Sequence, residues 1–371
     1  ILFLSCNGIT DFDIDAVLYA QLNLLIHKLE YHLLGNHLLE NGFALLFGAY
    51  YFNDPVFYKK AKAILIPELQ EQVLDDGGHF ERSPMYHCIM LYRVLDCYNL
   101  VRNNALFGRE LEDILKERAE DMMGWLEEVV YSDGRIPLLN DAAEGIAPTA
   151  KELIEYGQRL GIFCHKKVRL KESGYRKVRW GKFELFIDVG EVGPDYQPGH
   201  AHADTFSFEL YINGRPVIVD TGTSTYEVNN TRFYERSTAA HNTVVVSGHN
   251  SSQVWAGHRV ARRARVKVLC DEEERVIAVH DGYKRLRCLH TRKVEKMKEY
   301  IRIVDEIDCE GMAYLHFMPK ENIVLDGNRL TGSDYCIEFK GAREIESFTY
   351  MYAPEFNKRE ERRSFRMSFD R

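Results

Sequence analysis

Apolar residues recur at helical spacing through the first part of the chain, from about residue 15 to residue 160. A spacing of three to four residues puts apolar side chains on one face of a helix, so each run predicts an amphipathic helix. Gly, Asn, Asp and Pro occupy the joints, where helices end and begin. Short connections between successive helices predict antiparallel pairs. The predicted helices span residues 16–34, 37–52, 55–74, 85–101, 111–130 and 148–162.

Two joints carry a specific signal for the start of a helix. Asp54-Pro55 and Ser83-Pro84 each place a capping side chain directly before a proline. Proline suits the first helical position because the N–H that it lacks would find no partner there. We therefore expect helices to begin at Pro55 and at Pro84.

The pattern changes near residue 165, where alternating and β-branched runs replace the helical period. Asn213-Gly214 lies between two such runs, and this dipeptide is the strongest short signal for a hairpin. The second half is therefore expected to be a stack of antiparallel sheets, typical of a β-sandwich, after a charged linker at 164–174. The predicted strands lie within residues 177–190, 205–223, 241–250, 259–270, 275–283, 289–308 and 335–341.

Composition narrows the class of protein. A length of 371 residues supports two domains, and the apolar fraction of 45% excludes a disordered chain. No run of eighteen apolar residues is present, so we expect no membrane span. With 48 basic and 56 acidic residues the net charge is −8, which makes nucleic acid a poor candidate partner. Because the chain starts at Ile1 without a leader, we interpret it as a fragment.

The eight cysteines do not form C-x-x-C pairs and lie mostly in apolar contexts. Buried free thiols that pack as small apolar groups are the favoured interpretation. An even number also permits disulfides, so the cysteines do not indicate a compartment.

Polar residues that ordinary packing does not require gather in three segments. In the first, His37 and Glu40 lie three residues apart and would share one face of a helix. Asn36 beside them is either a helix cap or a third polar group of a site. The alternative to a site is that His37 and Glu40 form only a hydrogen-bonded pair in the core.

The second segment, residues 75–87, is a glycine-hinged loop that leads into a helix with Tyr86 and His87. Such junctions often present functional groups, although a solvated loop followed by a buried tyrosine would read the same way.

The third segment places His200 and His202 either side of an alanine, ahead of a predicted strand. Alternation along a strand would turn both imidazoles to one side. Asp220 ends a later strand, and His241 follows in the next polar segment. Two neutral imidazoles and a carboxylate suit Zn²⁺, so His202, Asp220 and His241 are candidate ligands. The spacing of residues on different strands does not identify a metal site, so the pattern alone does not decide whether these three residues bind a metal.

Taken in order, five segments resemble the heparinase II/III-like polysaccharide lyases over roughly residues 30–310: GNHLLEN, DDGGHFERSPMYH, PLLNDAAEG, PGHAHADTFSFELYINGRPVIVDTGTSTY and RSTAAHNTVVV. The resemblance implies a multidomain α + β protein. An incomplete α/α toroid would occupy residues 1–165, and an antiparallel β-sandwich would occupy residues 166–371. It also implies a bacterial periplasmic or secreted protein whose partner is an anionic, uronate-containing polysaccharide such as a glycosaminoglycan.

The resemblance further implies cleavage by β-elimination at a hexuronic acid. Asn36 and His37 would neutralise the uronate carboxylate, and Tyr86 and His200 would act as acid and base. Tyr226 is favoured over Tyr234 as a second catalytic tyrosine. The resemblance also implies a substrate contact at Asn140 and a mainly structural Zn²⁺ at His202, Asp220 and His241. Glu40, His87 and Arg236 are further candidates for substrate contact, and the Arg236 guanidinium would match a carboxylate or a sulfate.

Two other classes of function fit the same residues. A zinc-dependent hydrolase would use the His–His–Asp group directly, and its activity would follow metal occupancy. A non-catalytic glycan-binding or surface-polysaccharide biosynthesis protein would keep the scaffold without turnover. The particular glycan and the oligomeric state are not predicted.

Overall fold

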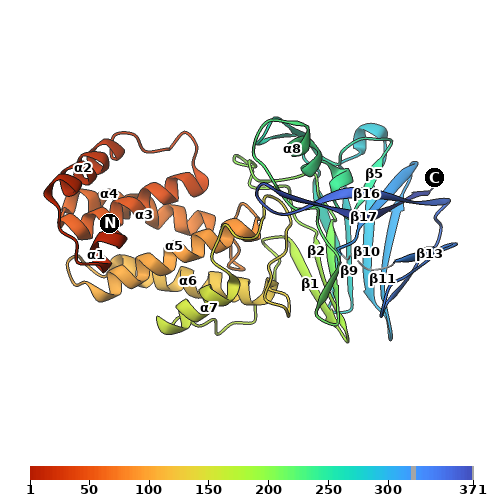
Figure 1. Cartoon of the computed structure of the whole chain (residues 1–371), viewed down its shortest axis with the longest axis horizontal. Helices are drawn as coiled ribbons and strands as arrows, with labels where there is room; N and C mark the ends of the chain where they lie inside the picture. The colour runs from red at the N-terminus through yellow and green to blue at the C-terminus, as the bar shows by residue number, and fades with distance from the viewer. Residues whose placement is uncertain (319–322, 370–371) are drawn as a thin grey trace. The chain divides into compact units, whose positions relative to one another are not determined.

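The computed structural model describes residues 1–318 and 323–369, and they form two compact units (Figure 1). The helical unit contains residues 1–80, 87–127 and 151–168. The sheet unit contains residues 81–86, 128–150 and the chain from 169 onward. Two short segments of the first half of the sequence therefore belong to the sheet unit. The predicted domains were contiguous, whereas the compact units alternate along the chain.

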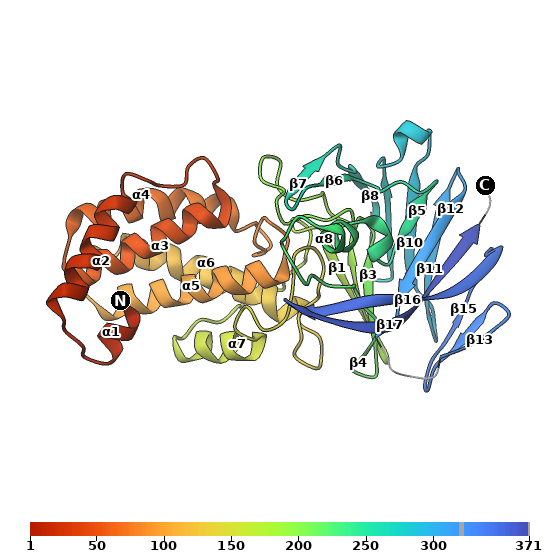
Figure 2. The same ribbon diagram turned by 45° about the horizontal axis from the view of Figure 1, so that its top comes forward.

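Every predicted helix is present, and a short N-terminal helix precedes them (Figure 2). The first predicted helix, 16–34, is wrong in its extent, because α2 ends at Leu25. Beyond this end, the Asn41 side chain accepts from the Glu30 backbone N–H at 2.9 Å and donates to the Glu30 carboxylate at 2.9 Å. These bonds hold the segment after α2 against α3. The helices are α1 (Leu2–Cys6), α2 (Phe12–Leu25), α3 (Gly35–Phe52), α4 (Pro55–Gln72), α5 (Pro84–Asn103), α6 (Glu110–Val129) and α7 (Ala150–Arg159).

The turn between α3 and α4 shows how local sequence fixes an antiparallel helix pair. Asn53 ends α3 in the left-handed conformation, with φ at 50°. Asp54 then caps α4, and its carboxylate accepts from the N–H groups of Val56 at 2.7 Å and Phe57 at 3.2 Å. Pro55 is the first residue of α4, as predicted.

The sheet unit is built from antiparallel sheets. Their hydrogen-bonded orders are β1-β2-β3-β4, β11-β10-β9-β8 and β16-β17-β12-β5, with smaller sheets β13-β14-β15 and β6-β7. The strands of the first two sheets are β1 (Tyr175–Trp180), β2 (Phe183–Asp188), β3 (Phe208–Ile212), β4 (Arg215–Ile218), β8 (Val266–Asp271), β9 (Arg275–His280), β10 (His290–Lys296) and β11 (Ile301–Ile307). The others are β5 (Val244–Val246), β6 (Gln253–Trp255), β7 (Arg259–Ala261), β12 (Gly311–His316), β13 (Val324–Asp326), β14 (Arg329–Thr331), β15 (Cys336–Glu338), β16 (Glu344–Glu355) and β17 (Lys358–Phe369).

The predicted hairpin at Asn213-Gly214 is confirmed. Ile212 pairs with Arg215, and the two turn residues have φ values of 52° and 70°, as a primed two-residue turn requires. The strand before this turn, β3, is buried along its whole length. Phe208, Leu210 and Ile212 enter the apolar core of the unit. Glu209 lies on the opposite face of β3 and bonds to the segment 128–150, as described below.

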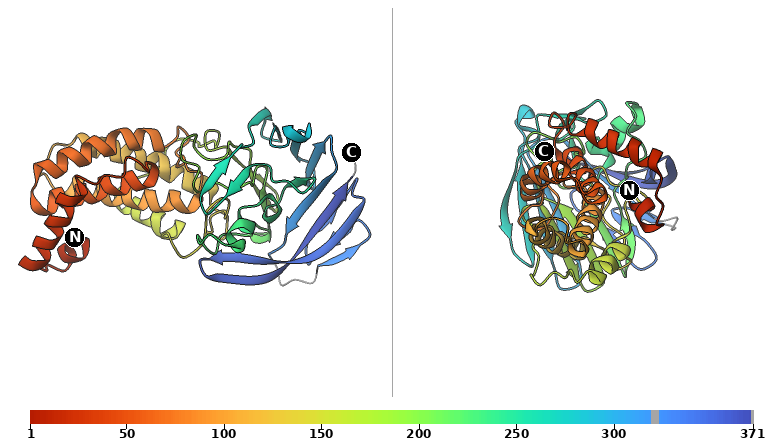
Figure 3. Two further views of the ribbon diagram at one scale, coloured as in Figure 1. Left: turned by 90° about the horizontal axis from the view of Figure 1, so that it is seen from above. Right: turned by 90° about the vertical axis from the view of Figure 1, so that its left-hand side faces the viewer.

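The apolar core of the sheet unit collects side chains from several sheets, including Leu185, Val276, Phe317 and Phe365. The predicted strands stop at residue 341, but β16 and β17 continue beyond them as a long C-terminal hairpin, drawn in dark blue in Figure 3. Of the eight cysteines, only Cys88, Cys97 and Cys288 are buried, so the prediction of buried thiols holds for part of the set. In the described part of the chain, no helix is long and apolar enough to cross a membrane.

Candidate active site

The loop between β2 and β3 carries His200 and His202, not a strand as the alternation suggested. Arg263 fixes the start of this loop by donating to the carbonyls of Pro194 at 2.7 Å and Asp195 at 2.6 Å. The Asp141 backbone N–H donates to the His200 carbonyl at 3.0 Å. These bonds hold the catalytic candidate at the edge of the sheet.

A second loop, in segment 128–150, meets the first through Asn140. Asn140 has a φ of 59°, a conformation that asparagine tolerates better than most residues. Its amide nitrogen donates to the Arg82 carbonyl at 3.1 Å, and its oxygen accepts from the His202 N–H at 3.0 Å. The side chain is thus used to join three segments. This favours a positioning role for Asn140 over the predicted substrate contact.

Asp141 lies at the centre of the site. Its carboxylate is fully buried and bonds to His200 Nδ1 at 3.0 Å, to His202 Nε2 at 2.8 Å, and to both terminal nitrogens of Arg232. Burial alone would raise the pKa of Asp141, but the Arg232 guanidinium and the two histidines hold it well below its usual value. Asp141 is therefore a permanent anion that orients both imidazoles.

Glu209 supports this arrangement from β3. Its carboxylate accepts from the Tyr131 hydroxyl at 2.9 Å, from the Leu138 N–H at 3.2 Å, and from the Asp220 N–H at 3.1 Å. Burial raises its pKa to about 7. One residue thereby links the loop of Asp141 to the end of β4.

Tyr86, Tyr226 and His200 lie together above Asp141. The two phenol oxygens are 3.3 Å apart, and the Tyr86 ring stacks on the His200 ring with centroids 3.9 Å apart. The Arg232 guanidinium lies over the Tyr226 ring at 4.9 Å. Three predicted catalytic residues, two from the sheet half and one from the helix-rich half of the sequence, are thus brought together.

Burial sets the protonation of the two tyrosines. It raises the pKa of Tyr86 to about 12, although the hydrogen bond from Tyr226 acts in the opposite direction. It raises the pKa of Tyr226 as well, and the Asp141 charge adds to the effect. Both groups are therefore neutral phenols near pH 7, and the Tyr86 hydroxyl is a proton donor.

Glu81 and Asp141 flank the His200 imidazole. Glu81 Oε2 lies 3.7 Å from His200 Nε2, while Asp141 holds Nδ1. Burial would lower the pKa of His200, but the Asp141 hydrogen bond and the Glu81 charge raise it above its ordinary value. Because an ionised Asp141 accepts the Nδ1 hydrogen, Nε2 is the nitrogen free to exchange a proton.

The predicted metal ligands His202, Asp220 and His241 are all fully buried. Asp220 Oδ2 lies 2.7 Å from His241 Nδ1, and the rings of His202 and His241 are 5.3 Å apart. Within the described residues, His202 Nδ1 and His241 Nε2 are buried without a hydrogen-bond partner. Two unsatisfied imidazole nitrogens beside a carboxylate fit a divalent transition metal.

A different trio has its donor atoms closer together. One donor atom each of Asp141, His200 and His258 lie within 4.8 Å of one another. The guanidinium already paired with Asp141 opposes a cation there, so the chemistry of the buried trio suits a metal better. The zinc assignment stays a prediction.

Asn36, His37 and Glu40 belong to the helical unit, in the first turns of α3. The His37 side chain is 48% exposed and lies 3.9 Å from the Glu30 carboxylate. Glu40 pairs with Arg93 at 3.1 Å. Their predicted roles toward substrate stay predictions.

His87 and Arg236 are buried and bond to protein groups. His87 Nε2 lies 3.0 Å from the Met122 carbonyl, and its Nδ1 accepts from the His79 N–H at 3.2 Å. The Arg236 guanidinium donates to the Ala201 carbonyl at 2.9 Å. These contacts favour structural or positioning roles over the predicted contact with substrate.

His87 should also make the helical unit sensitive to acid. Burial lowers its pKa to about 3, against about 6.5 in an unfolded chain. Below pH 6.5 the unfolded chain binds the proton and the folded one does not, so stability falls as pH falls, by up to about 1.4 kcal/mol per pH unit. In His87→Gln, urea unfolding followed by circular dichroism at pH 7, 6 and 5 should show a shallower slope. An unchanged slope would contradict this assignment.

Four residues of the site were not predicted in their present roles. Asp141 directly follows Asn140, which was assigned to substrate contact, and Arg232 lies between two of the segments that carry the family resemblance. Glu81 lies inside a recognised motif, so its position was a usable signal. His258 lies in no motif, and only the structure places its ring 5.1 Å from that of Tyr226.

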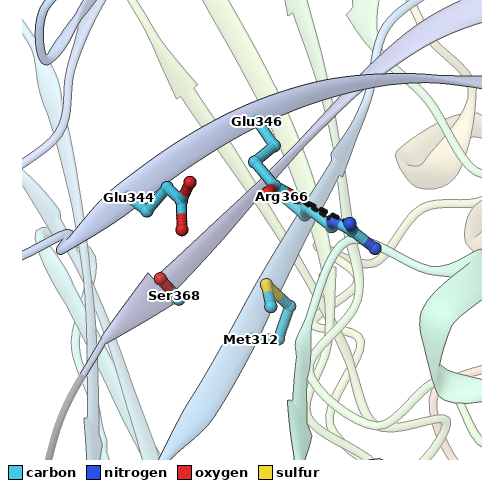
Figure 4. Close-up of a pocket in the computed structure, with 5 residues that line it drawn as sticks. All are labelled: Met312, Glu344, Glu346, Arg366 and Ser368. Carbon is cyan, nitrogen blue, oxygen red and sulfur yellow. Dashed lines mark hydrogen bonds and ion pairs between the residues drawn. The ribbon is translucent and has the colours of Figure 1, made fainter.

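A shallow hollow elsewhere on the sheet unit contains none of these residues. It lies on the sheet of β12, β16 and β17, where Arg366 and Glu346 form an ion pair at 2.6 Å (Figure 4). Met312, Glu344 and Ser368 complete its lining. An ion pair on an open strand surface is ordinary, so we assign no function to this hollow.

Comparison with known families gives matches to both halves of the chain. The family model described as "Heparinase II/III-like, C-terminal" matches residues 165–369, and the one described as "Heparinase II/III N-terminus" matches residues 1–168. Among solved structures, "Heparinase III-BT4657 gene product" superposes with a TM-score of 0.75 at 20% identity, covering 95% of this chain and 60% of that one. The similarity in structure confirms a helical part followed by an antiparallel β-sandwich.

Curated proteins are similar over shorter stretches of their own length. A "Heparin-sulfate lyase" of Bacteroides stercoris is 26% identical over 338 residues, which is 80% of this chain and 48% of that protein. "FtsZ-localized protein C" of Caulobacter vibrioides is 26% identical over 65% of this chain and 42% of its own length. The chain thus spans about half the length of the curated relatives that it matches.

Proposed function

The chain belongs to the heparinase II/III-like family, and from that premise we propose that it is a polysaccharide lyase that cleaves a uronate-containing glycan by β-elimination. The observation that carries the proposal is the grouping of Tyr86, Tyr226 and His200 on the buried Asp141–Arg232 ion pair. Relatives named heparin-sulfate lyases support a sulfated glycosaminoglycan as the substrate class. On the same ground we propose a periplasmic or secreted location.

The reaction requires three kinds of catalytic group: a base, an acid and a group that offsets the charge of the uronate carboxylate. A base removes the proton from the carbon next to the uronate carboxylate, and that electron pair forms a carbon–carbon double bond. The glycosidic carbon–oxygen bond then breaks, and an acid protonates the departing oxygen. A third group must offset the carboxylate charge as the enolate-like intermediate develops. No water is consumed, so the product is unsaturated.

The geometry supports one assignment of acid and base. Tyr86 is a neutral phenol at the pH of an assay and can protonate the leaving oxygen. His200 Nε2 can accept the carbon-bound proton, because Asp141 holds the opposite nitrogen and stabilises the imidazolium that forms. Tyr226, hydrogen-bonded to Tyr86, can orient its hydroxyl.

Charge neutralisation is assigned to Asn36 and His37 by the family resemblance. Both lie in the first turn of α3, and His37 is accessible. An amide and an imidazole can donate hydrogen bonds to a carboxylate without carrying a fixed full charge.

If Zn²⁺ binds, His202, Asp220 and His241 would hold it and the metal would crosslink the loop before β3 to the segments around β4 and β5. We expect chelation to lower the melting temperature of the sheet unit, because the two imidazoles would lose their partner. Differential scanning calorimetry with and without a chelator, together with metal analysis, measures this. An unchanged melting temperature after complete metal removal would refute the structural role.

The proposed function is tested by ultraviolet absorbance of the unsaturated product. Heparan sulfate, alginate and hyaluronan would be supplied in turn, and at least one should produce the new absorbance. Cleavage that yields reducing ends without this absorbance would instead indicate the zinc-dependent hydrolase.

A second candidate is a non-catalytic glycan-binding protein. The similarity to a protein named for its location with FtsZ, not for a lyase activity, favours considering it. Binding of a glycan without any turnover would support this candidate and contradict the lyase.

A further inference from the structure

The hairpin of β6 and β7 lies beside the site and has no role in the reaction described above. Figure 2 shows β6 and β7 side by side. Trp255 ends β6 and Arg259 begins β7, with Ala256, Gly257 and His258 between them. Ala256 has a φ of 49°, so the turn is tight. The hairpin is small, and its position depends on contacts outside its own two strands.

Two buried arginines fix the tip of this hairpin. Arg232 Nε donates to the Gly257 carbonyl at 3.0 Å, and Arg236 donates to the carbonyls of Ala256 at 3.3 Å and Arg259 at 3.4 Å. Arg232 is the guanidinium that also pairs with Asp141. The tip is therefore held by the same guanidinium that pairs with the buried Asp141 carboxylate.

His258 makes the hairpin continuous with the catalytic cluster. Its ring centroid lies 5.1 Å from that of Tyr226 and 5.9 Å from that of His200. Its Nδ1 lies 3.3 Å from the Gly199 carbonyl, just before His200 in the chain. A polysaccharide cleaved at Tyr86 and His200 would therefore extend beside the hairpin.

Trp255 and Arg259 share one face of the hairpin. They are directly paired across the two strands, and directly paired residues point to the same side of a sheet. Trp255 is 54% exposed, and Arg259 is exposed without an ion pair among the described residues. An exposed indole beside an unpaired guanidinium is a surface on which a ligand with an apolar ring face and an anionic group can bind.

We propose that this Trp255–Arg259 face is a binding subsite for an acidic sugar residue next to the bond that is cleaved. The indole packs on the C–H face of the sugar ring, and the guanidinium takes a carboxylate or a sulfate, both of which match its paired donors. This inference rests on the proposed function in taking an anionic glycan as the ligand. It adds the residues that select the neighbouring sugar.

The test uses Trp255→Ala and Arg259→Gln in the full chain. Two exposed residues elsewhere on the sheet unit serve as matched controls: Tyr300→Ala and Arg285→Gln. Binding is measured by calorimetry with a heparan sulfate tetrasaccharide and with its desulfated form, on a Tyr86→Phe background to prevent turnover. Each hairpin variant should raise Kd about tenfold, a typical loss for an aromatic or arginine anchor. The controls should change Kd less than twofold.

The experiment distinguishes a sugar carboxylate from a sulfate as the group bound by Arg259. It also distinguishes failure of the subsite from failure of the proposed lyase function. If Arg259→Gln weakens both tetrasaccharides, the guanidinium takes the carboxylate; if it weakens only the sulfated one, it takes the sulfate. Either result supports the subsite. Hairpin variants that bind like the controls would overturn it, even where the parent chain produces unsaturated product. If the hairpin variants bind more weakly than the controls but the parent chain produces no unsaturated product, the subsite is retained and the lyase function is rejected.

Discussion

Replacing Tyr86 by phenylalanine is expected to lower kcat by about a thousandfold or more while KM changes only a few fold. The substitution removes the hydroxyl that, in the proposed mechanism, would supply the proton for the leaving oxygen, and general acid catalysis contributes roughly 10²–10⁴ in rate. The ring stays, so its stacking on His200 at 3.9 Å and the fold around it should persist. Initial rates from product absorbance, with thermal unfolding of both proteins, measure the two effects.

Tyr234→Phe is the matched control for this experiment. Tyr234 lies on α8 (Asn230–Glu235) and was the alternative to Tyr226 as the second tyrosine. The Tyr86–Tyr226 contact at 3.3 Å favours Tyr226, so Tyr234→Phe should retain the parent rate within about a factor of two, as is usual for a residue outside the reacting groups. Equal losses from Tyr86→Phe and Tyr234→Phe would contradict the assignment of the acid.

The pKa of Tyr86 also predicts the alkaline limit of the reaction. An acid is lost as pH rises through its pKa, and burial raises that of Tyr86 to about 12. The alkaline limb of kcat/KM, which reports the free enzyme, should therefore lie above about pH 10. A limb near pH 8 that is absent in Tyr86→Phe would show a phenol of much lower pKa.

Replacing Asp141 by asparagine is expected to destabilise the sheet unit by about 3–5 kcal/mol. The change leaves the Arg232 guanidinium fully buried without its anion. Removing one partner of a buried ion pair is strongly destabilising, because the other charge stays buried without compensation. Urea unfolding followed by fluorescence measures the loss, on a Trp125→Phe background that leaves only Trp180 and Trp255, both in the sheet unit.

Glu346→Gln provides the comparison, because it breaks an ion pair whose side chains are 42% and 43% exposed. That loss should stay below about 1 kcal/mol. The double variant Asp141→Asn with Arg232→Met should recover part of the stability, since no unpaired charge then remains. A loss from Asp141→Asn no larger than that from Glu346→Gln would refute the central role of Asp141.

Local features of the fold were predictable because neighbouring residues determine them. Asp54-Pro55 specifies the start of α4 through a cap, and Asn213-Gly214 specifies a hairpin through two left-handed residues. The change of period near residue 165 similarly separated helices from strands. The end of α2 at Leu25 was not predictable in this way, because the apolar pattern continues past it to residue 34.

The candidate site was predictable only where a motif marked it. The resemblance identified Tyr86, His200 and Tyr226, which the structure brings together. The Asp141–Arg232 pair was missed because its two residues are 91 positions apart. Asp141 lies within the segment PLLNDAAEG, but neither that segment nor an arginine 91 positions later reveals, by composition or spacing, that the two charges neutralise one another in the buried interior.

The separation of Asp141 and Arg232 also has a consequence for biosynthesis. A ribosome that adds roughly 5–20 residues per second releases Asp141 about 5–20 s before Arg232. During that interval the carboxylate lacks its guanidinium, so burying it would place a charge in the interior without its arginine partner. The cluster around Asp141 can thus be completed only after Arg232 has emerged, which delays the finished site until synthesis is well past residue 232.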